Sequence, residues 1–308
     1  MKLIQTVKNC IRWLTPYGVI MLHRKKWQHN QLKMLAALSK KKKEIKNYFL
    51  NLNYSEQEYE ITEIIDYFRK HDFSVFPYEF TQNYHAKDVD IFYDELNKTR
   101  YVIHENKCLY FPDEWSIIQI QNYYNDLALE QDKDSPHRYE TEEFVVKDGD
   151  IIADIGAAEG FWTLQNIEKA SKAYLFECAP IWITALQKTF EPWKEKVVIV
   201  NKYVSDTNIK NCVTLDSFFY KQEINFIKAD IEGMELKLLE GSAEILKQND
   251  ALKLLLCTYH LENDAVRLKR FLENNGFETE YSKGYMLFSS DIDLREPYIR
   301  RGLIRARK

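Results

Sequence analysis

The chain has 308 residues, of which 45% are hydrophobic and 14% aromatic, so it is long and apolar enough for one large domain and an extension. Its five cysteines form no Cys-x-x-Cys pair, which argues against a disulfide scaffold or a zinc site and favours a reducing compartment. No stretch approaches the roughly 18–20 apolar residues of a membrane span, and no signal peptide is evident. We therefore expect a cytoplasmic protein.

The net charge of −4 is distributed unevenly along the chain. Residues 1–50 carry a net charge of +11 and residues 295–308 a net charge of +5, so residues 51–294 carry −20. We interpret the first segment as a basic helical arm and the last as a basic C-terminal tail. The acidic body between them would repel phosphates, and no RNA- or DNA-binding module is evident, so nucleic acid is not an expected partner.

The basic arm also contains apolar residues. Residues 13–22 are mostly apolar, and the basic segment 24–27 follows them. Apolar, aromatic and basic residues together suit the surface of an anionic membrane, so one interpretation is peripheral contact with the inner face of the membrane through residues 1–50. The other interpretation is a docking arm with a solvated lysine run at 40–43.

An α+β extension is predicted over residues 51–134, after the arm. The arm itself is expected to be largely helical, with a break at residues 16–18. Apolar residues at helical spacing predict a further helix over residues 56–71. We expect this N-terminal part to pack against the domain that follows it, because no low-complexity linker separates the two.

Short strands and turns are predicted over residues 73–111, in the form of antiparallel hairpins. A helix rich in aromatic residues is then predicted over residues 114–132. Trp115, Tyr123 and Tyr124 belong to this helix. They are candidates for stacking on a sugar, and core packing is the alternative for at least half of them.

A strand followed by a loop of small residues begins the second half of the chain. The apolar residues 151–153 predict a buried strand that ends at Asp154, and the loop then runs to Gly160. Gly156 and Gly160 allow the backbone to approach a bound cofactor, which the N–H groups of the helix predicted from Phe161 would face. A dinucleotide-binding turn usually has three glycines, so a nicotinamide cofactor is the weaker interpretation.

Acids follow three further predicted strands. These strands and acids are 173–176 with Glu177, 197–200 with Asp206, and 225–229 with Asp230 and Glu232. Glu177 lies about 20 residues past the loop, where nucleotide-binding α/β units place an acid on ribose hydroxyls. Because the carboxyl ends of parallel strands line one crevice, we expect the strand-end acids to share it. The alternative is that each acid caps the helix that follows.

Four segments of the chain resemble the FkbM-type S-adenosylmethionine-dependent methyltransferases. They are DIGAAEGFWTL at 154–164, FEC at 176–178, TLDS at 214–217 and IKADIEGMELKLLEG at 227–241. The resemblance covers about residues 135–290, and the last segment is its most specific part. The chain departs from the family at Ala158, where Asn is common.

This resemblance implies a class I methyltransferase fold over residues 135–294. That fold is an α/β domain with a Rossmann-like, doubly wound, mostly parallel sheet of seven strands, and the last two strands are expected at 277–281 and 285–289. The implied cofactor is S-adenosyl-L-methionine, with S-adenosyl-L-homocysteine as its product. No metal is expected, because the family is not generally metal-dependent.

The resemblance also implies a set of cofactor-binding residues. They are Asp154, Gly156, Ala157, Glu159, Gly160, Glu177, Asp206, Asp230 and Arg138. Arg138 precedes the first core strand, in a segment that often folds over the cofactor in class I enzymes. It would pair with the methionine carboxylate of the donor while His137 or Tyr139 closes the site. The alternative is that this segment is an ordinary surface turn.

The candidate catalytic residues are His260, Asp230 and Glu232. His260 follows the predicted fifth strand, 254–259, and an ordinary histidine pKa of about 6.5 suits a general base at neutral pH. A structural histidine is the alternative. Asp230 is the other candidate for the base or a contact for the methionine end of the donor, and Glu232 would act with it or cap the next helix.

O-methylation is the preferred reaction, because the Asn/Asp-Pro-Pro-Tyr/Phe signature of many amino-methyltransferases is absent after residues 225–229. The resemblance implies a small-molecule or glycan acceptor: a hydroxyl of a sugar, a polysaccharide precursor or a secondary metabolite. The basic arm favours a lipid-linked glycan. The alternatives are a catalytically inactive adenosyl-cofactor-binding module in a glycan biosynthesis assembly, and an enzyme with another adenosine-containing cofactor. The oligomeric state is left open.

Overall fold

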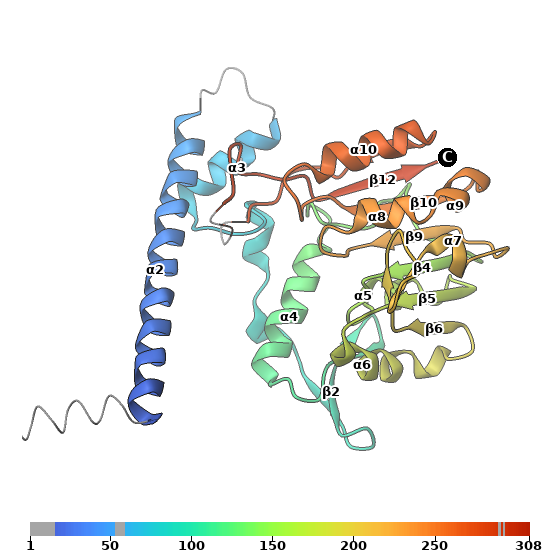
Figure 1. The fold of residues 1–308 in the computed structure, drawn as a ribbon, viewed down its shortest axis with the longest axis horizontal. Coiled ribbons are helices and arrows are strands. Elements are labelled where there is room, and N and C mark those ends of the chain that lie inside the picture. The colour runs from blue at the N-terminus through green and yellow to red at the C-terminus, as the bar shows by residue number, and fades with distance from the viewer. Residues whose placement is uncertain (1–15, 53–58, 289–290, 292) are drawn as a thin grey trace, which may run out of the picture.

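The computed structural model describes residues 16–52, 59–288, 291 and 293–308, with side chains from residue 33 onward. The apolar patch predicted at 13–22 therefore lies outside the described side chains. The chain forms an α/β domain with a helical and hairpin extension beside it (Figure 1). In the part of the chain that the structure describes, no helix is both long and apolar enough to cross a membrane.

A seven-stranded sheet in the order β11-β12-β10-β9-β4-β5-β6 forms the centre of the α/β domain. Its strands are β4 (Ile151–Ile155), β5 (Lys172–Phe176), β6 (Val197–Val200), β9 (Phe226–Ala229), β10 (Lys253–Cys257), β11 (Glu278–Tyr281) and β12 (Leu303–Arg307). Neighbouring strands are parallel, except that β12 runs antiparallel to β10 and β11. The predicted mostly parallel α/β sheet of seven strands is confirmed.

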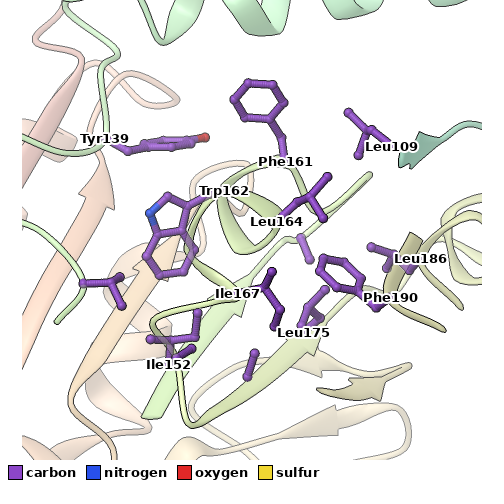
Figure 2. Packing of buried hydrophobic residues seen from close by; sticks show 14 of the residues in the cluster. Leu109, Tyr139, Ile152, Phe161, Trp162, Leu164, Ile167, Leu175, Leu186 and Phe190 are labelled. Carbon is purple, nitrogen blue, oxygen red and sulfur yellow. The ribbon is translucent and has the colours of Figure 1, made fainter. Parts of the chain in front are cut away.

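Helices cover both faces of this sheet (Figure 1). One face carries α5 (Phe161–Asn166) and α6 (Pro180–Phe190); the other carries α7 (Leu215–Phe218), α8 (Glu235–Glu240), α9 (Ala243–Gln248) and α10 (Asp264–Asn274). Figure 2 shows Leu164 of α5 packed with Leu186 and Phe190 of α6 above the sheet. Because both faces are covered, the central strands are near-continuous apolar runs, as parallel strands require.

The predicted hairpins of the extension are confirmed. β1 (Phe92–Asp94), β2 (Thr99–His104) and β3 (Lys107–Tyr110) form a three-stranded antiparallel sheet. Two short 3-10 helices, Glu79–Asn83 and Ala86–Asp88, precede this sheet.

Three helices belong to the same extension. They are α2 (Pro16–Asn51), α3 (Tyr59–Lys70) and α4 (Ile117–Glu130). The predicted break at 16–18 lies at the edge of the described residues and stays a prediction, since α2 begins at Pro16 and continues through Tyr17 and Gly18. Proline is well tolerated at the start of a helix, because its missing N–H would have no partner in the first turn.

The predicted boundary at residue 294 and the predicted strand at 285–289 are wrong. The chain enters the sheet at residues 303–307, so the segment interpreted as a basic tail supplies β12, between β10 and β11. Its arginines suggested solvent exposure, but Arg305 is buried and donates to the carbonyl oxygens of Arg138 (2.6 Å) and Tyr139 (3.1 Å). Among the described residues 285–288 of the predicted strand, only Met286 forms a bridge, to Arg300.

A separate hydrophobic cluster joins the extension to the C-terminal segment. Ile45 and Phe49 of α2 and Phe68 of α3 are buried in it together with Leu287 and Tyr298. The expected packing of the N-terminal part against the α/β domain is therefore observed. Residues 33–37 of α2, by contrast, are exposed on all sides, and Figure 1 shows this helix extending away from the body.

Candidate functional site

A cavity of about 250 Å³ lies at the carboxyl ends of β4 and β9, and we call it the strand-end cavity. One wall is the loop after β4, another is a face of α4, and Tyr139 and Asp230 complete it. The lining residues are Tyr123, Asp126, Leu127, Glu130, Gln131, Tyr139, Asp154, Gly156, Ala157, Ala158, Glu159, Phe161, Trp162, Lys228 and Asp230. Five of the predicted cofactor residues are thus together in one place, and one of them, Asp230, is also a predicted catalytic residue.

The loop after β4 is bonded to the end of β5. The N–H groups of Gly156 and Ala157 both donate to the carbonyl oxygen of Phe176, at 2.9 and 3.1 Å. Gly156 has φ of +75°, and a Cβ there would lie 2.0 Å from the carbonyl oxygen of Asp230, so only glycine fits. This close approach joins the loop to the end of β9, where Asp230 lies.

Glu177 holds the same loop through hydrogen bonds to the backbone. Its side chain is buried and accepts hydrogen bonds from the backbone N–H of Ala158 (2.8 Å) and of Ala179 (2.6 Å). It does not line the strand-end cavity. Each carboxylate oxygen has a second lone pair, so the predicted contact with ribose hydroxyls stays a prediction.

A buried ion pair lies under the cavity. Lys228 Nζ is 2.9 Å from Asp154 Oδ1 and also donates to the carbonyl oxygen of Gly156 at 3.1 Å. Thr163 donates to the other oxygen of Asp154. Burial disfavours the charge on Lys228, but Asp154 and Asp230 outweigh it and raise the pKa of the ammonium above its ordinary value. Lys228 therefore holds the first strand, the loop and β9 together as a cation.

The helix α4 contributes carboxylates that the sequence analysis did not select. Tyr123, Asp126 and Glu130 lie on one face of α4, because they are three and four residues apart. Tyr123 donates to Glu159 Oε2 at 2.8 Å and so connects the helix to the loop. Burial raises the pKa of Glu159, and partial desolvation raises that of Asp126, an exposed residue. The Glu130 side chain is 30% exposed, and desolvation with the charges of Asp230 and Glu159 raises its pKa to about 8.

Asp230 is the centre of a polar cluster at the ends of β9 and β10. Tyr259 donates to its two oxygens at 3.1 and 3.2 Å, and Tyr139 to one of them at 3.4 Å. His260 Nε2 lies 3.2 Å from Oδ1, and His137 Nε2 3.8 Å from Oδ2. Burial opposes ionisation of Asp230, but His260 and Lys228 outweigh it and hold the pKa of the carboxyl below its usual range.

His260 does not keep the ordinary pKa expected of it. Its Nε2 faces Asp230, and its Nδ1 lies 3.1 Å from Glu235 Oε1, an ion-pair distance without hydrogen-bond geometry. Burial lowers the pKa of the imidazole, but the two carboxylates outweigh burial and raise it to about 10. At neutral pH His260 is therefore a cation, and the premise that it is a free base is corrected.

This assignment predicts a pH dependence of folding. The folded-state pKa of His260 lies above the unfolded value of about 6.5, so the stabilisation is complete below about pH 6.5 and is lost as the pH rises towards 10. His260→Gln should flatten this part of the stability curve, measured as the difference in urea unfolding between parent and variant at pH 6, 8 and 9.5. An unchanged slope in the variant would contradict the ion pairs. His71→Gln, at the surface beside Glu79, is the control.

Like Gly160, Glu177 and His260, three further predicted residues do not line the strand-end cavity. Glu232 is 93% exposed, and its carboxylate is 3.9 Å from His260. Arg138 directs its guanidinium to the carbonyl oxygens of Glu140 (2.8 Å) and Gln131 (3.3 Å). Asp206 pairs with Lys237 at 2.7 Å, because β7 (Tyr203–Val204) carries the chain away after β6. The expectation that all the strand-end acids line one crevice is wrong for Asp206.

The predicted aromatic residues pack mainly on other rings of the protein. Trp115 lies 5.1 Å from Tyr123 and 5.1 Å from Trp182, measured between ring centroids. Tyr124 contacts His104, with 3.0 Å between the hydroxyl and Nδ1. Of the three predicted residues only Tyr123 reaches the strand-end cavity. Stacking on a sugar stays a prediction.

Side chains of the types that can hold a metal ion meet twice around Asp230 among the described residues. One group is His137, Asp230 and Cys257; the other is Asp230, Glu235 and His260. The second group is arranged as a protonated imidazole between two carboxylates, which is an ion-pair geometry.

The sheet order, the antiparallel β12 and the cavity at the strand ends define a class I methyltransferase fold. Residues 183–279 match the family model described as the methyltransferase FkbM domain. This match confirms the resemblance read from the sequence, and it covers the segment that follows the loop after β4 and β5.

Comparison with solved structures gave similar folds at low identity. The methyltransferase FkbM from Methylobacillus flagellatus KT is 16% identical, with 62% of this chain and 53% of that chain covered and a TM-score of 0.43. TYW2 of M. jannaschii in complex with AdoMet is 14% identical, with 67% and 84% covered and a TM-score of 0.39. The chain spans about half the length of the M. flagellatus protein. No curated protein matched the chain.

Proposed function

We propose that the chain is an S-adenosylmethionine-dependent O-methyltransferase that acts on a hydroxyl of a sugar, a glycan precursor or a secondary metabolite. The observation that carries this proposal is the acidic strand-end cavity. Its five carboxylates, Asp126, Glu130, Asp154, Glu159 and Asp230, face a single lysine, Lys228. A donor that carries a sulfonium and an α-ammonium group complements this excess of negative charge.

The residues around the cavity fit the proposed cofactor. The loop from Gly156 to Glu159 allows close approach of the backbone, and Gly156 leaves no room for a side chain on that wall. Glu177 would hold hydroxyl groups of the donor. When bound, S-adenosylmethionine supplies an activated methyl group, which the chain itself cannot provide.

Asp230 would take the proton of the acceptor hydroxyl. The proton of the acceptor hydroxyl would become strongly acidic once its oxygen carries the methyl group that the donor would supply. A carboxylate of low pKa then suffices as the proton acceptor. Tyr259 and His260 would act as positioning residues, since both contact the carboxylate of Asp230 and keep it ionised. The absence of the amino-methyltransferase signature after β9 supports a hydroxyl as the acceptor.

Radiolabelled methyl transfer tests the proposed activity. The protein, with methyl-labelled S-adenosylmethionine and fractionated glycan and lipid-linked extracts, should label a product that is stable to mild base, as an ether is and an ester is not. Asp230→Asn should reduce the rate by about 10²-fold or more while the donor still binds. Donor binding without transfer to any fraction would favour the inactive binding module, and base-labile label would exclude ether formation.

We further propose that the basic arm contacts anionic lipid. Arg24, Lys25 and Lys26 lie in α2, and each basic residue near such a surface contributes about 1 kcal/mol at low salt. We expect Arg24→Gln/Lys25→Gln/Lys26→Gln to lower sedimentation with phosphatidylserine vesicles at least tenfold. Deleting residues 1–50 is a poorer test, since Ile45 and Phe49 belong to the core. Equal sedimentation of parent and variant would remove the proposal, and neutral phosphatidylcholine vesicles are the control.

A further inference from the structure

The strand-end cavity contains three carboxylates that form no ion pair with a lysine or arginine among the described residues. Asp126 and Glu130 enter it from α4, and Glu159 enters it from the loop after β4. Lys228 reaches the same space, but its ammonium is bonded to Asp154 and to the carbonyl oxygen of Gly156. A cation brought by a ligand would therefore be the first one available to this group.

The groups around Glu130 favour its uncharged form while the cavity holds no cation. Burial disfavours its charge, and Asp230 at the end of β9, Glu159 on the loop and Asp126 on its own helix bring negative charge towards it, which outweighs the opposing charge of Lys228. His137 lies on the remaining side, with Nδ1 3.7 Å from Glu130 Oε2. Burial keeps that imidazole neutral by lowering its pKa to about 4, so it offers no compensating charge.

His137 also offers a hydrogen-bond partner to the protonated form of Glu130. Its ring is 1% exposed, and Nδ1 is a buried polar atom without a hydrogen-bond partner. Nε2 of the same ring lies 3.3 Å from the hydroxyl oxygen of Tyr259. A protonated Glu130 can turn towards Nδ1, while an ionised Glu130 can turn towards a positive group in the cavity.

We propose that Glu130 makes the cavity distinguish the methyl donor from its product: it is ionised when the sulfonium of the donor is bound and protonated when the neutral thioether is bound. This inference rests on the proposed function. The donor and the product differ at one atom, since sulfur loses its positive charge with the methyl group. Glu130 would thus release a proton when the donor binds and regain one after transfer, which weakens attraction for the product and favours its release.

Isothermal titration calorimetry in buffers of different ionisation enthalpy measures the protons released on binding. At pH 7, S-adenosylmethionine should release about 0.5–0.9 proton more than S-adenosylhomocysteine. The α-ammonium group is common to both ligands and cancels in the comparison. The affinity ratio of donor to product should rise by up to about tenfold per pH unit between pH 6 and 7.5 and level off above pH 8.

Glu130→Gln should abolish this difference, because the amide cannot ionise. The extra proton should vanish, and the affinity ratio should no longer change with pH. Glu143→Gln, at an exposed acid before β4, is the matched control and should behave as the parent. The comparison of the two ligands on the parent protein already tests the proposal if the variant fails to fold.

Three outcomes separate this inference from the proposed function. If neither ligand binds, the proposed function itself fails. If both bind with the same proton release, or if the extra proton persists in Glu130→Gln, the assignment of Glu130 is overturned while the cofactor is retained. If the donor alone releases the proton and Glu130→Gln removes it, the assignment stands.

Discussion

Replacing Lys228 with methionine is expected to lower the free energy of unfolding by about 3–5 kcal/mol, because the change leaves the buried carboxylate of Asp154 without its cation. The ammonium also bonds the carbonyl oxygen of Gly156, so the loop after β4 loses a contact as well. Urea unfolding at pH 7 measures the loss.

A second lysine–aspartate pair provides the control for Lys228. Lys237 lies 2.7 Å from Asp206, a similar distance, but its side chain is 49% exposed. Lys237→Met should therefore cost less than about 1 kcal/mol. Similar losses in the two variants would mean that burial of the Lys228–Asp154 pair has no energetic consequence, and the structural role given to Lys228 would then be wrong.

Replacing Gly156 with alanine is expected to damage both the fold and the site. The added Cβ would lie 2.0 Å from the carbonyl oxygen of Asp230, and the backbone has φ of +75°. The conformation alone costs about 1–2 kcal/mol, and relieving the overlap adds about 1–3 kcal/mol. Separation of the loop from β9 should also weaken binding of S-adenosylhomocysteine by at least about tenfold, measured by calorimetry.

Gly149 separates the two causes of that damage. Its φ is +90°, yet a Cβ there meets nothing within 4 Å. Gly149→Ala should therefore cost only about 1–2 kcal/mol and leave binding unchanged. If Gly156→Ala bound the product as tightly as Gly149→Ala does, the contact between the loop and Asp230 would not matter for the site.

The sheet was largely predictable, because buried parallel strands leave local apolar runs. β4, β5, β6 and β9 begin and end within a residue or two of their predicted positions. The sequence did not predict β12, because this strand alternates apolar residues with arginines. Arg305 can be buried there because it donates to the carbonyl oxygens of residues 138 and 139, which lie far away in the sequence.

The candidate site was predictable where its chemistry is local in sequence. The loop at 154–160 and Asp230 follow directly from strand ends and small residues. Lys228 was missed, although a lone charge inside the buried strand β9 is a usable signal for a buried ion pair. The raised pKa of His260 could not be predicted from the sequence. It depends on Asp230 and Glu235, which only the fold brings to the two nitrogens of the imidazole.

A crystal structure of the protein with S-adenosylhomocysteine tests the central claim most directly. We expect the thioether and the amino acid portion of the product in the strand-end cavity, between Gly156, Glu130 and Asp230, with the ribose on the side of Glu177. Density for the ligand at any other place on the chain, or a cavity still filled by its own side chains at saturating ligand, would contradict the account.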